Sequence, residues 1–442
     1  MDLPTAVESN DPERLLAESP MSWRQKVAIA MCVLLNGLDG FDVLSISFAS
    51  PGIAKEWGIG RDALGVVLSM ELIGMGVGSV ILGQMADRIG RRLTVVLCLV
   101  IMAAGMLSTT QAGTIGLLAV TRLATGIGIG GMLATTNALV AEYSNRKSRG
   151  AAVAIMAAGY PAGAVVGGAI ASALLAVGGW RDVFLLGAAM TAICLPLVPW
   201  LLPEPVGALL HRRGGTSLDR VNKSLKALGH APVTSIPPYT PRAPKAPVAE
   251  LFEGGLAPIT MLLTFAYFFH IMTFYFILKW VPKIVADMGF SPSAAGGVLV
   301  WANIGGLAGA LLFSVLSLRY PTRRLLMFAL LGAVVTICVF GLGQADLRGL
   351  SMAAAAGGFC TNAAVVGLYA LVAASFPTTV RAGGTGFVIG AGRGGAALSP
   401  IVVGVLFQWG FGLSLVATIM ACGSLIAVLA LLVLPKYDAV NR

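Results

Sequence analysis

Apolar stretches long enough to cross a membrane recur along almost the whole chain. A first series of six is expected at residues 26–50, 62–83, 93–112, 115–142, 150–176 and 181–202. A second series is expected at residues 256–281, 293–317, 324–344, 350–375, 383–408 and 412–435. A spanning helix needs about 20 mostly apolar residues. The pattern therefore predicts an all-α integral membrane protein with twelve transmembrane helices in two pseudo-symmetric six-helix bundles.

Polar segments divide the chain into five parts. A tail at 1–25 precedes the first bundle at 26–202, and a central loop at 203–255 leads to the second bundle at 256–435. A short tail at 436–442 follows. The first tail is acidic, unlike the basic start of a cleavable signal peptide. Within the central loop, the part from Thr216 to Gly229 is predicted to form an amphipathic helix on the membrane surface.

The charged residues give the orientation. Of 442 residues, 57% are hydrophobic and 11% are charged, whereas soluble domains carry about 25% charged residues. If both termini share one side, the segments on that side hold 22 of the 30 lysines and arginines. Because basic residues collect in cytoplasmic loops, both termini are expected in the cytoplasm. The basic residues of the cytoplasmic loops therefore explain the net charge of +10, and no nucleic-acid partner is expected.

No enzyme signature is present. The six cysteines lie inside apolar runs without C-x-x-C spacing. The chain also has no G-x-x-x-x-G-K-[ST] phosphate loop, no H-E-x-x-H sequence and no nucleophile elbow. We therefore expect neither an enzyme nor an ATP-driven pump, and no metal or cofactor.

The two halves repeat each other at a constant offset of 232 residues. Ala138–Ala141 aligns with Ala370–Ala373, and Arg149 aligns with Arg381. Parallel repeats around a central path are a known construction of transporters, with the substrate held between them. Transport is therefore the leading class of function.

Ionisable residues inside spans are functional candidates because they are costly there. Asp39 and Asp42 lie one helical turn apart and share a face. We expect them, with Glu71 of the second span, to couple transport to protons; a structural pair neutralised by arginine is the alternative. Arg122 of the fourth span lies at the depth of Asp42, about 12 Å from the outer surface. Arg122 is expected either to bind a substrate carboxylate through two hydrogen bonds or to form a permanent salt bridge with Asp42.

The second half offers aromatic and polar candidates for substrate binding. The seventh span is rich in aromatic residues, of which Tyr267 and Tyr275 also carry a hydroxyl group. His270 is a candidate for transferring protons or for forming a hydrogen bond with the substrate. A structural histidine with hydrogen bonds inside the protein is the alternative. Asn303 aligns with Glu71 across the repeat, and Arg393 of the eleventh span is a second candidate for the substrate carboxylate. For each single aromatic residue, a position facing lipid is the alternative.

Several motifs resemble those of the major facilitator superfamily. The loop after the second span reads Gly83-Gln-Met-Ala-Asp-Arg-Ile-Gly-Arg-Arg92, similar to the signature G-x-x-x-D-R-x-G-R-R. The fourth span opens Arg122-x-x-x-Gly126-x-Gly128-x-Gly130, and the fifth contains Gly159-Tyr-Pro161-Ala-Gly163. A narrower resemblance, to the aromatic acid:proton symporters, rests on four further segments. These are Asp39-Gly-Phe-Asp42, Ala141-Glu142-Tyr143, Gly179-Trp180-Arg181 and Phe376-Pro-Thr-Thr-Val-Arg381.

The resemblance implies import of a benzoate-, hydroxybenzoate- or protocatechuate-type anion by proton symport with alternating access. It also implies a bacterial inner membrane and a monomer, and that Asp87 stabilises a gate closed toward the cytoplasm. Arg88 and Arg91 of the same motif are gating candidates, with positive charge that only sets the topology as the alternative for Arg91. Glu142, at the inner end of the fourth span, is expected to act as a gate or to pair with the basic loops. The alternatives are symport of non-aromatic organic acids, proton-antiporting export, and a membrane sensor that does not transport.

Overall fold

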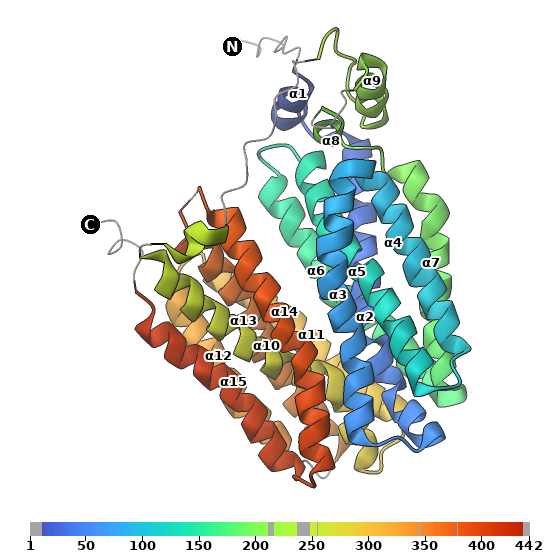
Figure 1. Cartoon of the computed structure of the whole chain (residues 1–442), viewed down its shortest axis with the longest axis vertical. Helices are drawn as coiled ribbons and strands as arrows, with labels where there is room; N and C mark the ends of the chain where they lie inside the picture. The colour runs from blue at the N-terminus through green and yellow to red at the C-terminus, as the bar shows by residue number, and fades with distance from the viewer. Residues whose placement is uncertain are drawn as a thin grey trace.

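The computed structural model describes residues 11–210, 216–236, 248–253, 255–343, 346–377 and 379–435. Within this part of the chain, twelve helices are long and apolar enough to cross a membrane. They form two sets of six that lie side by side, one blue to green and one yellow to red in Figure 1. The prediction of twelve spanning helices in two bundles is confirmed.

The first set, which we call the N-half, runs from α2 to α7. Its helices are α2 (Trp23–Trp57), α3 (Arg61–Ile89), α4 (Arg91–Thr110), α5 (Ile115–Tyr143), α6 (Arg149–Val177) and α7 (Trp180–Leu201). The second set, the C-half, runs from α10 to α15. Its helices are α10 (Leu256–Asp287), α11 (Pro292–Leu316), α12 (Thr322–Gly341), α13 (Leu347–Ser375), α14 (Arg381–Gln408) and α15 (Leu413–Val433). Several of these helices, α2 and α10 above all, continue well beyond the predicted apolar runs.

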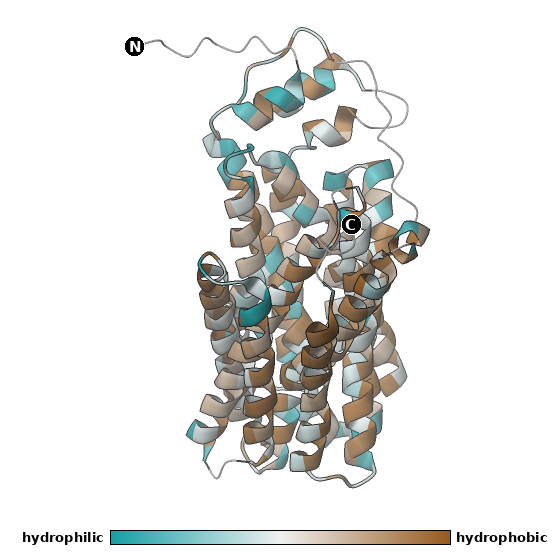
Figure 2. Ribbon diagram, turned by 90° about the vertical axis from the view of Figure 1, so that its left-hand side faces the viewer, coloured by the Kyte–Doolittle hydropathy of each residue, from teal (hydrophilic) through white to brown (hydrophobic). Residues whose placement is uncertain are grey.

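Short elements gather at one end of the bundles, which we call the linker end. They are α1 (Pro12–Glu18), α8 (Val206–Leu210), α9 (Leu218–Ala227) and the 3₁₀ helix η1 (Val248–Phe252). Figure 1 shows α1, α8 and α9 together above the N-half, and Figure 2 shows hydrophilic residues concentrated there and apolar residues along the helices. The other end, where α2 turns into α3, is called the far end below.

The structure corrects the prediction for the segment from Thr216 to Gly229. Its helix α9 forms, but the apolar side chains Val221 and Leu225 are fully buried. The hydroxyl group of Ser22 donates to the carbonyl of Leu228, which ties the end of α9 to the start of α2. Because its apolar face packs on the protein, that face is not available to a membrane surface.

Glycines let the helices of each half approach closely. A methyl group on Gly126 of α5 would overlap the carbonyl oxygen of Glu71 on α3. The repeat preserves this contact, since a methyl group on Gly358 of α13 would overlap the carbonyl of Ala302 on α11. Small residues at helix interfaces are the usual basis of tight packing in membranes. Each half is therefore expected to move as a rigid unit.

Among the described residues, the polar contacts between the halves lie between mid-depth and the far end. At the far end, Arg61 of α3 forms an ion pair with Asp287 of α10, with Nη2 and Oδ2 at 2.8 Å. Near mid-depth, Nη1 of Arg393 on α14 donates to the carbonyl of Met75 on α3, at 3.0 Å. Figure 1 shows the two sets of ribbons diverging toward the linker end. The halves are therefore joined at the far end.

We predict that Gly126→Ala destabilises the N-half by about 1–3 kcal/mol, because the added methyl group forces α5 away from α3. Gly116→Ala is the matched control on the same helix, since no atom lies within 4 Å of the new methyl group. Thermal unfolding of the purified protein in detergent measures both. Equal unfolding temperatures for the two variants would contradict close α3–α5 packing.

Candidate functional site

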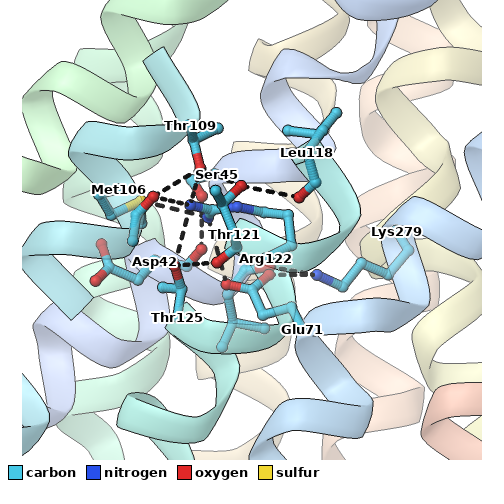
Figure 3. A network of polar contacts seen from close by, with 12 residues as sticks. Asp42, Ser45, Glu71, Met106, Thr109, Leu118, Thr121, Arg122, Thr125 and Lys279 are labelled. Atoms are coloured by element: carbon cyan, nitrogen blue, oxygen red, sulfur yellow. Dashed lines mark hydrogen bonds and ion pairs between the residues drawn. The ribbon is translucent and has the colours of Figure 1, made fainter. Parts of the chain in front are cut away.

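Five ionisable side chains lie buried inside the spanning region, four of them in the N-half and the fifth reaching them from the C-half. α2 supplies Asp39 and Asp42, α3 supplies Glu71, α5 supplies Arg122, and α10 supplies Lys279. None of the five has measurable solvent exposure. Figure 3 shows four of them, with Glu71 between Arg122 and Lys279. Buried charges in membrane helices are expensive and mark sites for ions or charged substrates.

The two aspartates of α2 are buried because this helix is surrounded by α5, α6, α7 and α10. No carboxylate oxygen of Asp39 or Asp42 has a hydrogen-bond partner among the described residues. Gly187 of α7 leaves room beside Asp42, since a methyl group there would lie 3.1 Å from Oδ1. Either aspartate can therefore gain or lose a proton without breaking a hydrogen bond.

Arg122 is held within the N-half. Its Nη2 donates to the hydroxyl oxygens of Thr109, at 2.6 Å, and Thr125, at 3.1 Å. The guanidinium also lies over the ring of Phe184, at 4.6 Å from the centroid, where a cation is attracted to the π face. Its ion partner is Glu71, with Nη1 and Oε1 at 3.8 Å.

The structure refines the expected cluster of Asp42, Arg122 and Glu71. The three side chains come together, as their equal depth suggests. Within the described part of the chain, however, Arg122 forms its ion pair with Glu71 and no ion pair with Asp42. A permanent Arg122–Asp42 salt bridge, one of the two readings of the sequence, is therefore absent from these residues.

Glu71 lies between two cations that come from different halves. Its Oε1 faces Arg122, and its Oε2 lies 3.5 Å from Nζ of Lys279. The ammonium group of Lys279 also donates to the carbonyl of Val43 on α2. The site is therefore an ionic link across the interface, not only a cluster within the N-half.

The candidates on α10 have different surroundings. Both ring nitrogens of His270 are engaged within the C-half, Nδ1 with Ser424 Oγ at 2.9 Å and Nε2 with the Thr361 carbonyl at 3.1 Å. Tyr267 is buried, and its hydroxyl lies 3.2 Å from that of Tyr369 on α13. These contacts link α10 to α15 and α13.

The remaining C-half candidates lie on three helices. Tyr275 of α10 is half-buried, with its ring in edge contact with Phe274. Asn303 of α11 is buried and donates to the carbonyl of Leu299 one turn earlier. Among these three, Arg393 of α14 has a polar contact across the interface within the described part of the chain, because it donates to the N-half carbonyl described above.

The predicted gating residues lie at the linker end. Asp87 and Arg88 are exposed at the end of α3. Arg91 and Glu142 form an ion pair of 2.7 Å within the N-half, between α4 and α5. The carboxylate of Glu204 accepts from the backbone amide of Arg91 at 2.6 Å, so an acid caps the start of α4.

Sequence reasoning missed two of these residues. Lys279 stands two residues before the end of the predicted span at 256–281, a position typical of the membrane boundary, but α10 continues to Asp287. Lys279 lies eight residues before the end of α10, which gives it the same depth in the membrane as the one expected for Asp42. That depth could have identified it as a candidate. Glu204 lies in the polar segment after α7, where no spacing rule connects it to the start of α4.

A membrane protein of two repeated six-helix bundles with charges buried between them has the construction of a secondary transporter. A family model described as Major Facilitator Superfamily matches residues 32–278 and 260–442. The chain therefore belongs to the Major Facilitator Superfamily, as the sequence motifs suggested.

Similar proteins support a narrower resemblance. The chain is 31% identical to the gallate transporter of Pseudomonas putida, over 93% of this chain and 92% of that protein. It is 29% identical to the 4-hydroxybenzoate transporter PcaK of Pseudomonas aeruginosa, over 97% and 96% of the two chains. The crystal structure of a D-xylose-proton symporter has the same fold, with a TM-score of 0.72 at 17% identity, covering 93% of this chain and 98% of that chain. The resemblance to aromatic acid transporters is confirmed.

We predict that a double-mutant cycle on Glu71 and Arg122 gives a larger coupling energy than a cycle on Asp42 and Arg122. Contacting charged pairs couple by about 0.5–3 kcal/mol, and Glu71 is the ion partner in the structure. Glu71→Gln, Asp42→Asn and Arg122→Met, singly and in pairs, provide the variants, and unfolding in detergent provides the measurement. A larger coupling for Asp42 would contradict the arrangement described above.

Proposed function

We propose that this protein imports aromatic carboxylates of the benzoate, hydroxybenzoate or protocatechuate type together with protons, by alternating access. Transporters named for gallate, 4-hydroxybenzoate and benzoate are among its relatives, which supports a substrate with a ring and a carboxylate. The substrate and protons are its partners, and it acts as a monomer in the inner membrane of a bacterium. It is a carrier and performs no enzymatic reaction.

The observation that carries this proposal is the buried charge cluster. Three carboxylates (Asp39, Asp42 and Glu71) share one interior with two cations, Arg122 and Lys279. With all five groups ionised the cluster has one excess negative charge, which a single proton neutralises. A low-dielectric interior penalises uncompensated charge strongly, so the cluster is suited to loading and releasing a proton.

The expected orientation gives the two ends their roles. The linker end faces the cytoplasm, where the basic loops and both termini lie, so the far end faces outward. Arg61 and Asp287 join the halves at that outer end. The arrangement is that of a carrier closed to the outside. Asp87, Arg88, Arg91 and Glu142 belong to the opposing gate, which closes the cytoplasmic end in the other state.

The substrate is expected to lie between the halves, beside the cluster. Arg122 reaches a substrate carboxylate only by releasing Glu71, because its Nη2 already donates to Thr109 and Thr125. Tyr267 and Tyr275 supply aromatic surface and hydroxyl groups from the C-half, and Asn303 and Arg393 supply further donors. Protons load onto Asp39, Asp42 and Glu71 in the N-half.

We predict that the protein in proteoliposomes accumulates labelled 4-hydroxybenzoate when the outside is more acidic than the lumen. Asp42→Asn is expected to abolish this accumulation, because an amide cannot carry the proton, while exchange of labelled for unlabelled substrate persists. Protein-free vesicles measure passive entry of the protonated acid. Asp219→Asn makes the same change at an exposed position of α9 and serves as the control.

Two outcomes would contradict the proposal. Uptake of a simple organic acid without uptake of any aromatic acid would remove the substrate class. Accumulation by Asp42→Asn equal to that of the unmodified protein would remove Asp42 from proton coupling.

A further inference from the structure

Lys279 has surroundings that set it apart from Lys283, the other lysine of α10. It lies eight residues before the end of the helix, about 12 Å inside, and is fully buried. Lys283, one turn further on, pairs instead with Asp287 of the same helix. A lysine is rarely buried without a specific reason, because its ammonium group is strongly hydrated.

Both partners of Lys279 belong to the other half of the molecule. Nζ lies 3.5 Å from Oε2 of Glu71 on α3 and donates to the carbonyl of Val43 on α2. Arg122, by contrast, keeps its hydroxyl partners Thr109 and Thr125 within its own half. An opening of the outer end that separates α10 from α2 and α3 would remove the partners of Lys279 and leave the hydroxyl partners of Arg122 in place.

We propose that Lys279 binds the carboxylate of the substrate when the outer end is open, and exchanges it for Glu71 when the outer end closes. This inference rests on the proposed function, in which the substrate is an aromatic carboxylate. Tyr275 lies four residues before Lys279 and therefore on the same face of α10. A carboxylate at Lys279 places the ring of the substrate toward Tyr275.

The exchange links the substrate to the proton. When Lys279 turns to the substrate, Glu71 keeps Arg122 as its only cation. A proton from the outer solution then forms an O–H bond on Asp42, whose carboxylate oxygens have no hydrogen-bond partner among the described residues, and restores the balance of charge. On closure, that O–H bond breaks, the proton leaves toward the cytoplasmic end, and Lys279 returns to Glu71. The substrate carboxylate, having lost its cation, is released on the same side.

Substrate exchange in proteoliposomes tests this inference without a proton gradient. The probe is labelled 4-hydroxybenzoate, and the measured quantities are KM and maximal rate. Lys279→Gln is expected to raise KM by about 10-fold to 100-fold, because a charge-assisted hydrogen bond to the substrate is lost. Lys279→Arg, which keeps the charge, is expected to restore most of the affinity. Lys283→Gln is the matched control and is expected to leave KM unchanged.

A double variant separates substrate binding from a purely structural salt bridge. If Lys279 only neutralises Glu71, then Glu71→Gln combined with Lys279→Gln removes both charges and returns KM to its original value. If Lys279 binds the substrate, KM stays raised in the double variant. The double variant leaves no unpaired charge at this position, so it can be measured even if Lys279→Gln alone does not fold. A restored KM overturns the inference. Absence of aromatic acid exchange by the unmodified protein instead overturns the proposed function, so the two failures are distinguishable.

Discussion

Charge balance inside a hydrocarbon environment is the constraint on which this structure depends. The interior of the N-half, together with Lys279 from the C-half, holds three carboxylates and two cations without contact with solvent. Every such group needs a partner, a proton or a nearby counter-charge, because an isolated buried charge is very costly. A movement that removes the ion partner of one group therefore changes the charge that the remaining groups must balance. That dependence is a physical basis for coupling a motion to a proton.

Packing divides the molecule into parts that hold their shape and parts that separate. Within each half, glycines allow backbone contact, as Gly126 does against α3 and Gly358 against α11. Between the halves, the polar links include Arg61–Asp287, Lys279–Glu71 and the contact of Arg393 with a backbone carbonyl. Rigid halves joined by a small number of polar contacts suit a rocking motion around a central site.

The sequence predicted most of the fold because length and hydropathy determine what crosses a membrane. It also brought Asp42, Glu71 and Arg122 to one depth, since depth follows from counting residues along a helix. It could not give the direction of each side chain around its helix, so the choice of Glu71 over Asp42 as the partner of Arg122 needed the structure. The role of Lys279 was missed because helix α10 continues beyond its apolar run.

The most direct test of the account is simultaneous measurement of proton and substrate entry into proteoliposomes. A pH-sensitive dye in the lumen reports protons while labelled 4-hydroxybenzoate reports the substrate, and protein-free vesicles give the passive contribution of the protonated acid. The account predicts that the lumen acidifies in proportion to substrate entry beyond this passive level. Protein-dependent substrate entry without any accompanying acidification would contradict proton coupling through the buried cluster.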